Sequence, residues 1–114
     1  MSERIESKLR YYLDCRYDSR ASFYCKAEVE EFSDGSFVLK SYSNYVACIM
    51  PDGKAHVRGK YSQTTTRHIK EFLKQFNFKA DNLSQILKDY GDDLIEEGTE
   101  EFGWRMFLLD RGLR

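Results

Sequence analysis

The sequence predicts an α+β fold with an N-terminal helix, a three-stranded antiparallel meander, and then two or three helices packed on the sheet. Three observations predict this order. Apolar residues recur with a helical period near the N-terminus, alternate with polar residues between 23 and 61, and return to a helical period after 62. The chain has 114 residues, 41% of them hydrophobic and 15% aromatic, which favours one folded domain over 1–114.

The first predicted helix runs from Ser2 to about Cys15. Ser2 is a suitable N-cap, because its hydroxyl can accept a hydrogen bond from a backbone N–H of the first turn. The apolar side chains that follow fall on one helical face, at i, i+4, i+7 and i+8: Ile5, Leu9, Tyr12 and Leu13.

The predicted meander places its strands at about 23–30, 37–50 and 55–61. The sequences at 33–36 and 51–54 predict the two turns, since each contains a glycine that adopts the positive φ of tight turns. Apolar alternation loses phase within the second strand, which predicts a β-bulge at 41–44.

The third predicted strand carries a basic face. Alternate residues of a strand point to the same side, so four residues are expected to share one face: Lys54, His56, Arg58 and Lys60. A two-residue turn at 52–53 would place Arg58 opposite Ala47. This face could contact phosphates, or it could be a solvated surface whose charges prevent edge pairing.

Two helices are predicted after the sheet. The first spans about 65–77, with an apolar stripe at i, i+3, i+4 and i+7 and with threonines suited to capping at 64–66. The second begins near Asn82 and either ends at Gly91 or continues to Glu97. The apolar run at 104–109 is compatible with a strand or a helix.

The net charge of −1 is a cancellation between two parts of the chain. Residues 1–88 contain 15 basic and 11 acidic residues, a balance of +4, whereas 89–114 contain 3 and 8, a balance of −5. Seven basic residues and one acid, Glu71, fall within 54–79, and seven acids with no base fall within 89–101. Such asymmetry bears on binding partners and not on fold.

The acidic segment is one candidate site. If it is helical, its carboxylates form a single stripe that destabilises the helix by like-charge repulsion: Asp89, Asp92, Asp93, Glu96, Glu97, Glu100 and Glu101. We interpret the stripe as a surface that resembles a phosphate backbone and occupies the nucleic-acid-binding cleft of a host effector protein. A solubilising face, or docking onto the basic surface of the same molecule, is the plainer interpretation.

The basic segment is the alternative site, for DNA or RNA directly. Its candidate residues are those of the third strand and the following helix: Lys54, Arg58, Lys60, Thr64, Arg67, Lys70 and Lys74. The start of this helix could also bind a small anion or nucleotide, through its free N–H groups, three threonines and Arg67. Simple capping of the helix by the threonines is the plainer interpretation.

Catalysis, metal binding and membrane insertion find little support in the sequence. The two histidines are not part of a known nucleophile motif, and the three cysteines, Cys15, Cys25 and Cys48, lack CxxC spacing. No apolar run approaches the length of a membrane span, and the first residues lack a signal-peptide core. We therefore expect a cytoplasmic protein without enzymatic activity, metal or cofactor.

Part of the chain resembles a known domain. The stretch 41–75, and above all its Tyr-Ser-x-Thr-Thr-x-Arg-His-Ile core at 61–69, is similar to a small domain of unknown function from proteins of phages and conjugative elements of Gram-positive bacteria. The resemblance implies an accessory protein that binds host or element macromolecules. Together with the acidic segment, it leads us to expect an inhibitor of a host defence nuclease, of the anti-CRISPR or anti-restriction type.

Overall fold

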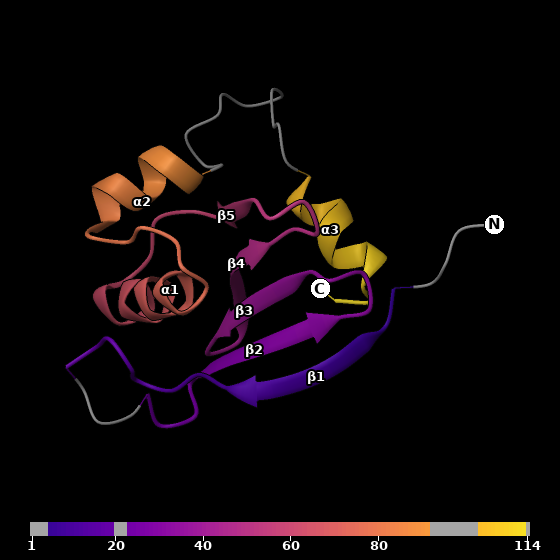
Figure 1. Ribbon diagram of the computed structural model, residues 1–114, viewed down its shortest axis with the longest axis horizontal. Coiled ribbons are helices and arrows are strands. Elements are labelled where there is room, and N and C mark those ends of the chain that lie inside the picture. The colour runs from indigo at the N-terminus through magenta and orange to yellow at the C-terminus, as the bar shows by residue number, and fades with distance from the viewer. Residues whose placement is uncertain (1–4, 20–22, 92–102, 114) are drawn as a thin grey trace.

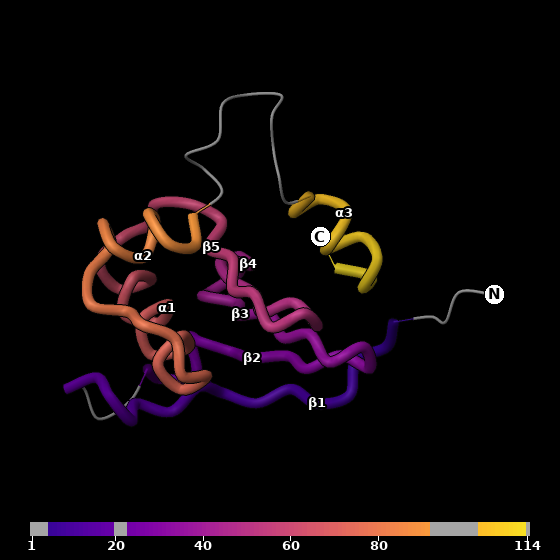
Figure 2. Tube along the Cα trace, turned by 45° about the horizontal axis from the view of Figure 1, so that its top comes forward, coloured from indigo at the N-terminus to yellow at the C-terminus, as the bar shows by residue number. Residues whose placement is uncertain are grey.

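A computed structural model describes residues 5–19, 23–91 and 103–113. Within these residues the fold is α+β, as predicted, but its layout differs: a five-stranded antiparallel sheet comes first and three helices follow (Figure 1). The strands are β1 (Ser7–Tyr12), β2 (Ala27–Phe32), β3 (Phe37–Ser41), β4 (Asn44–Ile49) and β5 (Ala55–Val57). The helices are α1 (Gln63–Gln75), α2 (Leu83–Tyr90) and α3 (Trp104–Asp110). Each strand pairs with the next along the chain, so β1 and β5 are the edges (Figure 2).

The predicted N-terminal helix is wrong, because this segment forms the edge strand β1. Tyr11 lies opposite Val29 of β2, and the N–H of Leu13 donates to the carbonyl of Ala27 at 2.8 Å. Residues 9, 11 and 13 are apolar and alternate with polar or aromatic neighbours, so this short window fits the period of a strand as well as that of a helix. The ladder of hydrogen bonds to β2 decides between the two periods.

The predicted three-stranded meander is also wrong, because its long second strand is a hairpin of β3 and β4. Ser41 pairs with Asn44, and Tyr42 turns the chain with a φ of 56°. A tyrosine rarely adopts this left-handed conformation. The turn contains neither glycine nor proline, so the sequence does not indicate it. The hairpin does contain an irregularity, since Leu39 faces Ala47 whereas Lys40 faces Tyr45.

Both predicted turns are present. Phe32 and Ser36 close the first, where Gly35 has a φ of 89°. The second turn has three residues, 51–53, because the N–H of Gly53 donates to the carbonyl of Met50 and Gly53 has a φ of 86°. The extra residue shifts the predicted register by one, so Val57 and not the following arginine lies opposite Ala47.

The two faces of the sheet bury separate cores. Odd-numbered β3 residues such as Leu39 pack with Ile69, Phe72 and Leu73 of α1 and with Ile86 of α2. On the other face a smaller cluster forms between the strands and α3, from Phe32, Val38, Cys48, Trp104, Phe107 and Leu108. Complete burial of each large apolar side chain contributes about 1.5–3 kcal/mol. The strands' two-residue period therefore places α1 and α2 on one face and α3 on the other.

Helices α1 and α2 begin and end at identifiable caps. Ser62 accepts from the N–H of Thr65, so α1 starts two residues before the predicted boundary, and Asn77 ends it with a φ of 67°. Helix α2 begins beside Asn82 as predicted, with the Asn82 side chain as its N-cap, and Gly91 leaves the helix in an extended conformation. A Cβ at Gly91 would lie 2.5 Å from the carbonyl oxygen of Leu87, so this close approach requires glycine.

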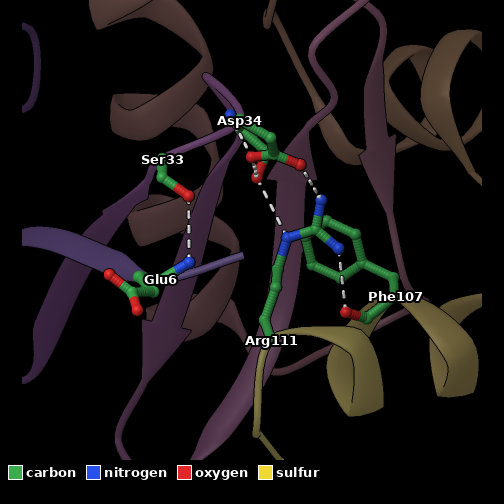
Figure 3. A network of polar contacts seen from close by, with 6 residues as sticks. Glu6, Ser33, Asp34, Phe107 and Arg111 are labelled. Atoms are coloured by element: carbon green, nitrogen blue, oxygen red, sulfur yellow. Dashed lines mark hydrogen bonds and ion pairs between the residues drawn. The ribbon is translucent and has the colours of Figure 1, made fainter. Parts of the chain in front are cut away.

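Helix α3 is fixed to the sheet by a buried arginine (Figure 3). Arg111 donates from Nη2 to Asp34 at 2.5 Å, from Nε to Ser36 at 3.0 Å and from Nη1 to the carbonyl of Phe107 at 3.0 Å. Its side chain is only 3% exposed, and its guanidinium lies 3.9 Å from the centre of the Phe107 ring. The turn between β2 and β3 is thereby joined to the C-terminal helix.

Candidate functional site

The loop at 14–19 lies against α1 because a buried glutamate holds it there. Glu71 is 1% exposed, and its Oε1 accepts from the backbone N–H groups of Tyr17 at 2.8 Å and Asp18 at 2.9 Å. Gln75 donates from Nε2 both to the other carboxylate oxygen and to the carbonyl of Asp14. Since these bonds use both carboxylate oxygens of Glu71, the loop has a defined position beside the helix.

A cleft of about 410 Å³ opens between this loop and α1. We call it the α1 cleft; it is lined by Tyr17, Asp18, Ser19, Gln63, Thr66, Arg67, Lys70, Glu71 and Lys74. Arg67 lies 3.6 Å from Asp18 and keeps 33% of its side chain exposed. Neither Lys70 nor Lys74 forms an ion pair with any residue that the structure describes. The cleft therefore presents three cations, two of which no described carboxylate neutralises.

A second pocket, of about 280 Å³, adjoins the α1 cleft at Arg67. We call it the tyrosine pocket; it is lined by Phe23, Tyr24, Lys26, Tyr42, Thr64, Arg67 and His68. The His68 ring lies 4.6 Å from the Phe23 ring and 5.8 Å from the Tyr42 ring. Aromatic rings and two cations thus surround one concave surface.

Two unusual turns hold the tyrosines of this pocket at the surface. The N–H of Lys26 donates to the carbonyl of Phe23 across a turn in which Tyr24 and Cys25 both have positive φ, 53° and 61°. Asparagine and glycine normally occupy such positions. The N–H of Tyr42 then donates to the carbonyl of Lys26 at 2.8 Å, which ties this turn to the β3–β4 turn.

A buried polar group of three side chains supports the pocket from beneath. The Ser41 hydroxyl lies 2.7 Å from Nδ1 of His68 and 3.1 Å from the hydroxyl of Thr65. Ser41 is only 1% exposed, so its oxygen has no path to a substrate in this conformation. The arrangement positions the β3–β4 turn on α1 and does not present an accessible nucleophile.

The structure separates the predicted basic residues into two groups. Arg67, Lys70 and Lys74 line the α1 cleft, and Thr64 lines the tyrosine pocket. The guanidinium of Arg58 instead lies 5.9 Å from the centre of the Trp104 ring, on the sheet face that α3 covers. Lys54 and Lys60 are exposed outside β5, which is shorter than the predicted strand. Arg58 therefore does not share a surface with the three basic residues of α1.

Most of the predicted acidic stripe lies outside the described residues. Asp89, near the end of α2, is exposed and accepts from Nε2 of Gln85 at 2.7 Å. Because Gly91 is extended, α2 does not continue into a helix that would align Asp89 with the later carboxylates. The six members beyond the described part are Asp92, Asp93, Glu96, Glu97, Glu100 and Glu101.

Several residues of the two cavities escaped sequence reasoning. The loop residues of the α1 cleft carry no motif, because backbone bonds to a distant glutamate determine their position. Glu71 did carry a signal, as the one acid among the bases of 54–79. Tyr24 and Tyr42 lie in turns without glycine, so the usual turn residues do not mark these turns in the sequence.

The described residues contain neither a metal site nor a membrane span. No group of three or more His, Cys, Asp or Glu side chains in 5–19, 23–91 and 103–113 is placed to hold a metal ion. None of the helices described is both long and apolar enough to cross a membrane.

Comparison with known proteins relates the chain to one family. No curated protein and no solved structure gives a significant match. The model of a family of unknown function, DUF8033, matches residues 11–89, which include the described residues of both cavities and exclude most of the acidic segment. This match confirms the expected domain of unknown function. Since it covers more than half of the chain, the protein belongs to the DUF8033 family.

Proposed function

We propose that this protein is a nucleic-acid-binding module that holds phosphates in the α1 cleft. The observation that carries the proposal is the pair Lys70 and Lys74, which line the cleft beside Arg67 and have no ion pair among the described residues. The carboxylate of Glu71 is occupied by backbone and amide donors, so it leaves the lysines available to an external anion. Such cations bind phosphates largely by releasing condensed counterions.

The charges of the cleft favour an extended polyanion over a single small anion. The three cations follow one another along α1 at i, i+3 and i+7, so they occupy successive turns of the helix. Three phosphate contacts predict that the logarithm of affinity falls with that of salt concentration with a slope of about −2 to −3. A strong salt dependence of this kind is the signature of the proposed mode.

Fluorescence anisotropy with labelled oligonucleotides of about 12 residues tests the proposal. Lys70→Gln with Lys74→Gln is expected to weaken binding at low salt by about tenfold or more. The magnitude of the salt slope should fall by about 2, because two phosphate contacts are lost. Lys79→Gln with Lys88→Gln is the matched control, because these lysines are exposed and outside both cavities. Failure of the natural protein to bind any oligonucleotide at low salt would contradict the proposal.

A second proposal retains the acidic segment as a protein-binding surface. Its support is the run of seven acids without a base in 89–101, which suits a competitor of nucleic acid in the cleft of a host defence nuclease. Replacing Asp92, Asp93, Glu96 and Glu97 by alanine should abolish capture of such a nuclease from nuclease-treated lysate. Undiminished capture would contradict this second proposal. Either function suits a cytoplasmic accessory protein of a phage or mobile element, the setting that the resemblance over 41–75 suggests.

A further inference from the structure

The tyrosine pocket shares Arg67 with the α1 cleft, and this junction indicates which form of nucleic acid fits. Building on the proposed phosphate site, we infer that the tyrosine pocket receives an unstacked base of a single-stranded nucleic acid whose backbone lies in the α1 cleft. Arg67 lines both cavities, so a cation stands where the base-bearing and phosphate-bearing parts of one nucleotide would meet.

The chemistry of the pocket suits a base. The His68 ring lies 4.6 Å from the Phe23 ring and 5.8 Å from the Tyr42 ring, so two buried rings stand beside the exposed ring of Tyr42. Proteins that bind single strands place bases on such aromatic side chains, and every base offers a π-face. Lys26 and Arg67, which also line the pocket, would contact the phosphates on either side of the base.

The backbone of the two turns gives an independent argument. Tyr24 and Tyr42 are 73% and 52% exposed, and both adopt a left-handed conformation that asparagine or glycine would adopt with less strain. A tyrosine at these two positions therefore does not favour the turn conformation. Because both rings are largely exposed, they also add little to the burial of apolar surface in the core. Non-glycine residues in left-handed conformations often occur at ligand-binding sites.

The size of the pocket argues against a duplex. At about 280 Å³ the pocket is small and concave, so a base must leave its stack to enter it. Bases of a duplex are paired and stacked, whereas those of a single strand can be splayed outward. The inference therefore predicts a preference for single strands that phosphate contacts alone would not produce.

Three probes of about 12 nucleotides separate the contributions of base and phosphate. They are single-stranded oligothymidylate, an abasic strand of the same length that retains the phosphates, and a blunt duplex. The natural protein should bind oligothymidylate roughly 5- to 150-fold more tightly than the abasic strand, the range expected for one stacked base. The duplex should bind no more tightly than the abasic strand.

The decisive variant combines Tyr24→Asn with Tyr42→Asn. Asparagine tolerates the left-handed conformation, so both turns should persist while the rings are removed. Affinity for oligothymidylate should fall to that of the abasic strand, and affinity for the abasic strand should not change. Tyr42→Trp should retain the preference for bases, and Tyr12→Thr, a control at an exposed tyrosine of β1, should change neither affinity.

The outcomes distinguish this inference from the proposed function on which it rests. Equal binding of oligothymidylate and the abasic strand, or an asparagine double variant that binds like the natural protein, would overturn the base pocket alone. Loss of affinity for both strands in Lys70→Gln with Lys74→Gln would still support the phosphate site. Absence of binding to all three probes would overturn both.

Discussion

Two arginines, one on each face of the sheet, differ in how completely the protein uses their donors. Arg111 is 3% exposed and is bonded to Asp34, Ser36 and the carbonyl of Phe107. Arg67 is 33% exposed, and the Asp18 carboxylate lies 3.6 Å from its guanidinium, a distance longer than a hydrogen bond. The guanidinium of Arg111 therefore stabilises the fold, whereas that of Arg67 remains able to contact a ligand.

The same contrast extends to the surroundings of each arginine. Around Arg111, the rings of Phe32 and Phe107 and a carboxylate leave no room for an external anion. Around Arg67, two cavities meet, and the buried carboxylate that lines one of them, Glu71, is bonded to backbone N–H groups. The charge of Arg111 is therefore compensated by Asp34, whereas Lys70 and Lys74 beside Arg67 form no ion pair with a described residue.

The largest expected effect follows from removing the compensated arginine. Arg111→Met leaves Asp34 without its cation and Ser36 without one donor, so the free energy of unfolding should fall by about 2–4 kcal/mol. Urea unfolding followed by circular dichroism measures this loss. Oligonucleotide affinity of the folded variant should be unchanged, and a loss of affinity as large as that of the α1 variants would break the distinction between the two arginines.

A smaller effect is expected where the loop meets α1. Glu71→Gln keeps the shape of the side chain but replaces charge-assisted bonds to Tyr17 and Asp18 by neutral ones, which should cost about 1–2 kcal/mol of stability. Amide hydrogen exchange at Tyr17 and Asp18 should accelerate more than exchange in β2 or β3. Unchanged exchange at both amides would show that Glu71 does not hold the loop.

The third prediction concerns acid stability on the α3 face. Burial on its own would raise the pKa of Asp34, but hydrogen bonds from Ser36 and the charge of Arg111 outweigh it, so the pKa lies below its ordinary value of 3.8. The ionised carboxylate therefore stabilises the fold above about pH 4, and this contribution is lost as the pH falls through the lowered pKa. As the pH falls below about 4, the natural protein should lose more stability than Asp34→Asn, and parallel pH profiles would contradict this.

Sequence patterns identified the parts of the fold that local chemistry determines. Helices α1 and α2 were predicted because the spacing of their apolar stripes is a property of each helix alone. The turns at 33–36 and 51–54 were predicted because Gly35 and Gly53 supply positive φ. Edge strand β1 was missed because its few apolar residues fit both periods, and only pairing with β2 decides between them. The β3–β4 turn was missed because a tyrosine adopts the left-handed conformation there.

The candidate site was predictable only in its helical half. Arg67, Lys70 and Lys74 were expected as one basic surface of a helix because their spacing lies within α1. Arg58 was grouped with them on charge alone, and the structure places it over Trp104 on the other face. Tyr24 and Tyr42 join the site through contacts between distant turns, which one sequence does not reveal.

The affinity of Arg67→Gln for oligothymidylate at about 50 mM salt tests the central claim most directly, because Arg67 lines both cavities. Its ion pair with Asp18 is partly exposed and longer than a hydrogen bond, so losing it should cost about 1 kcal/mol and leave the variant folded. The account predicts that affinity falls about tenfold or more, while the matched variant Arg58→Gln on the other face binds like the natural protein. Equal affinities of Arg67→Gln and the natural protein would contradict the assignment of this surface to nucleic acid.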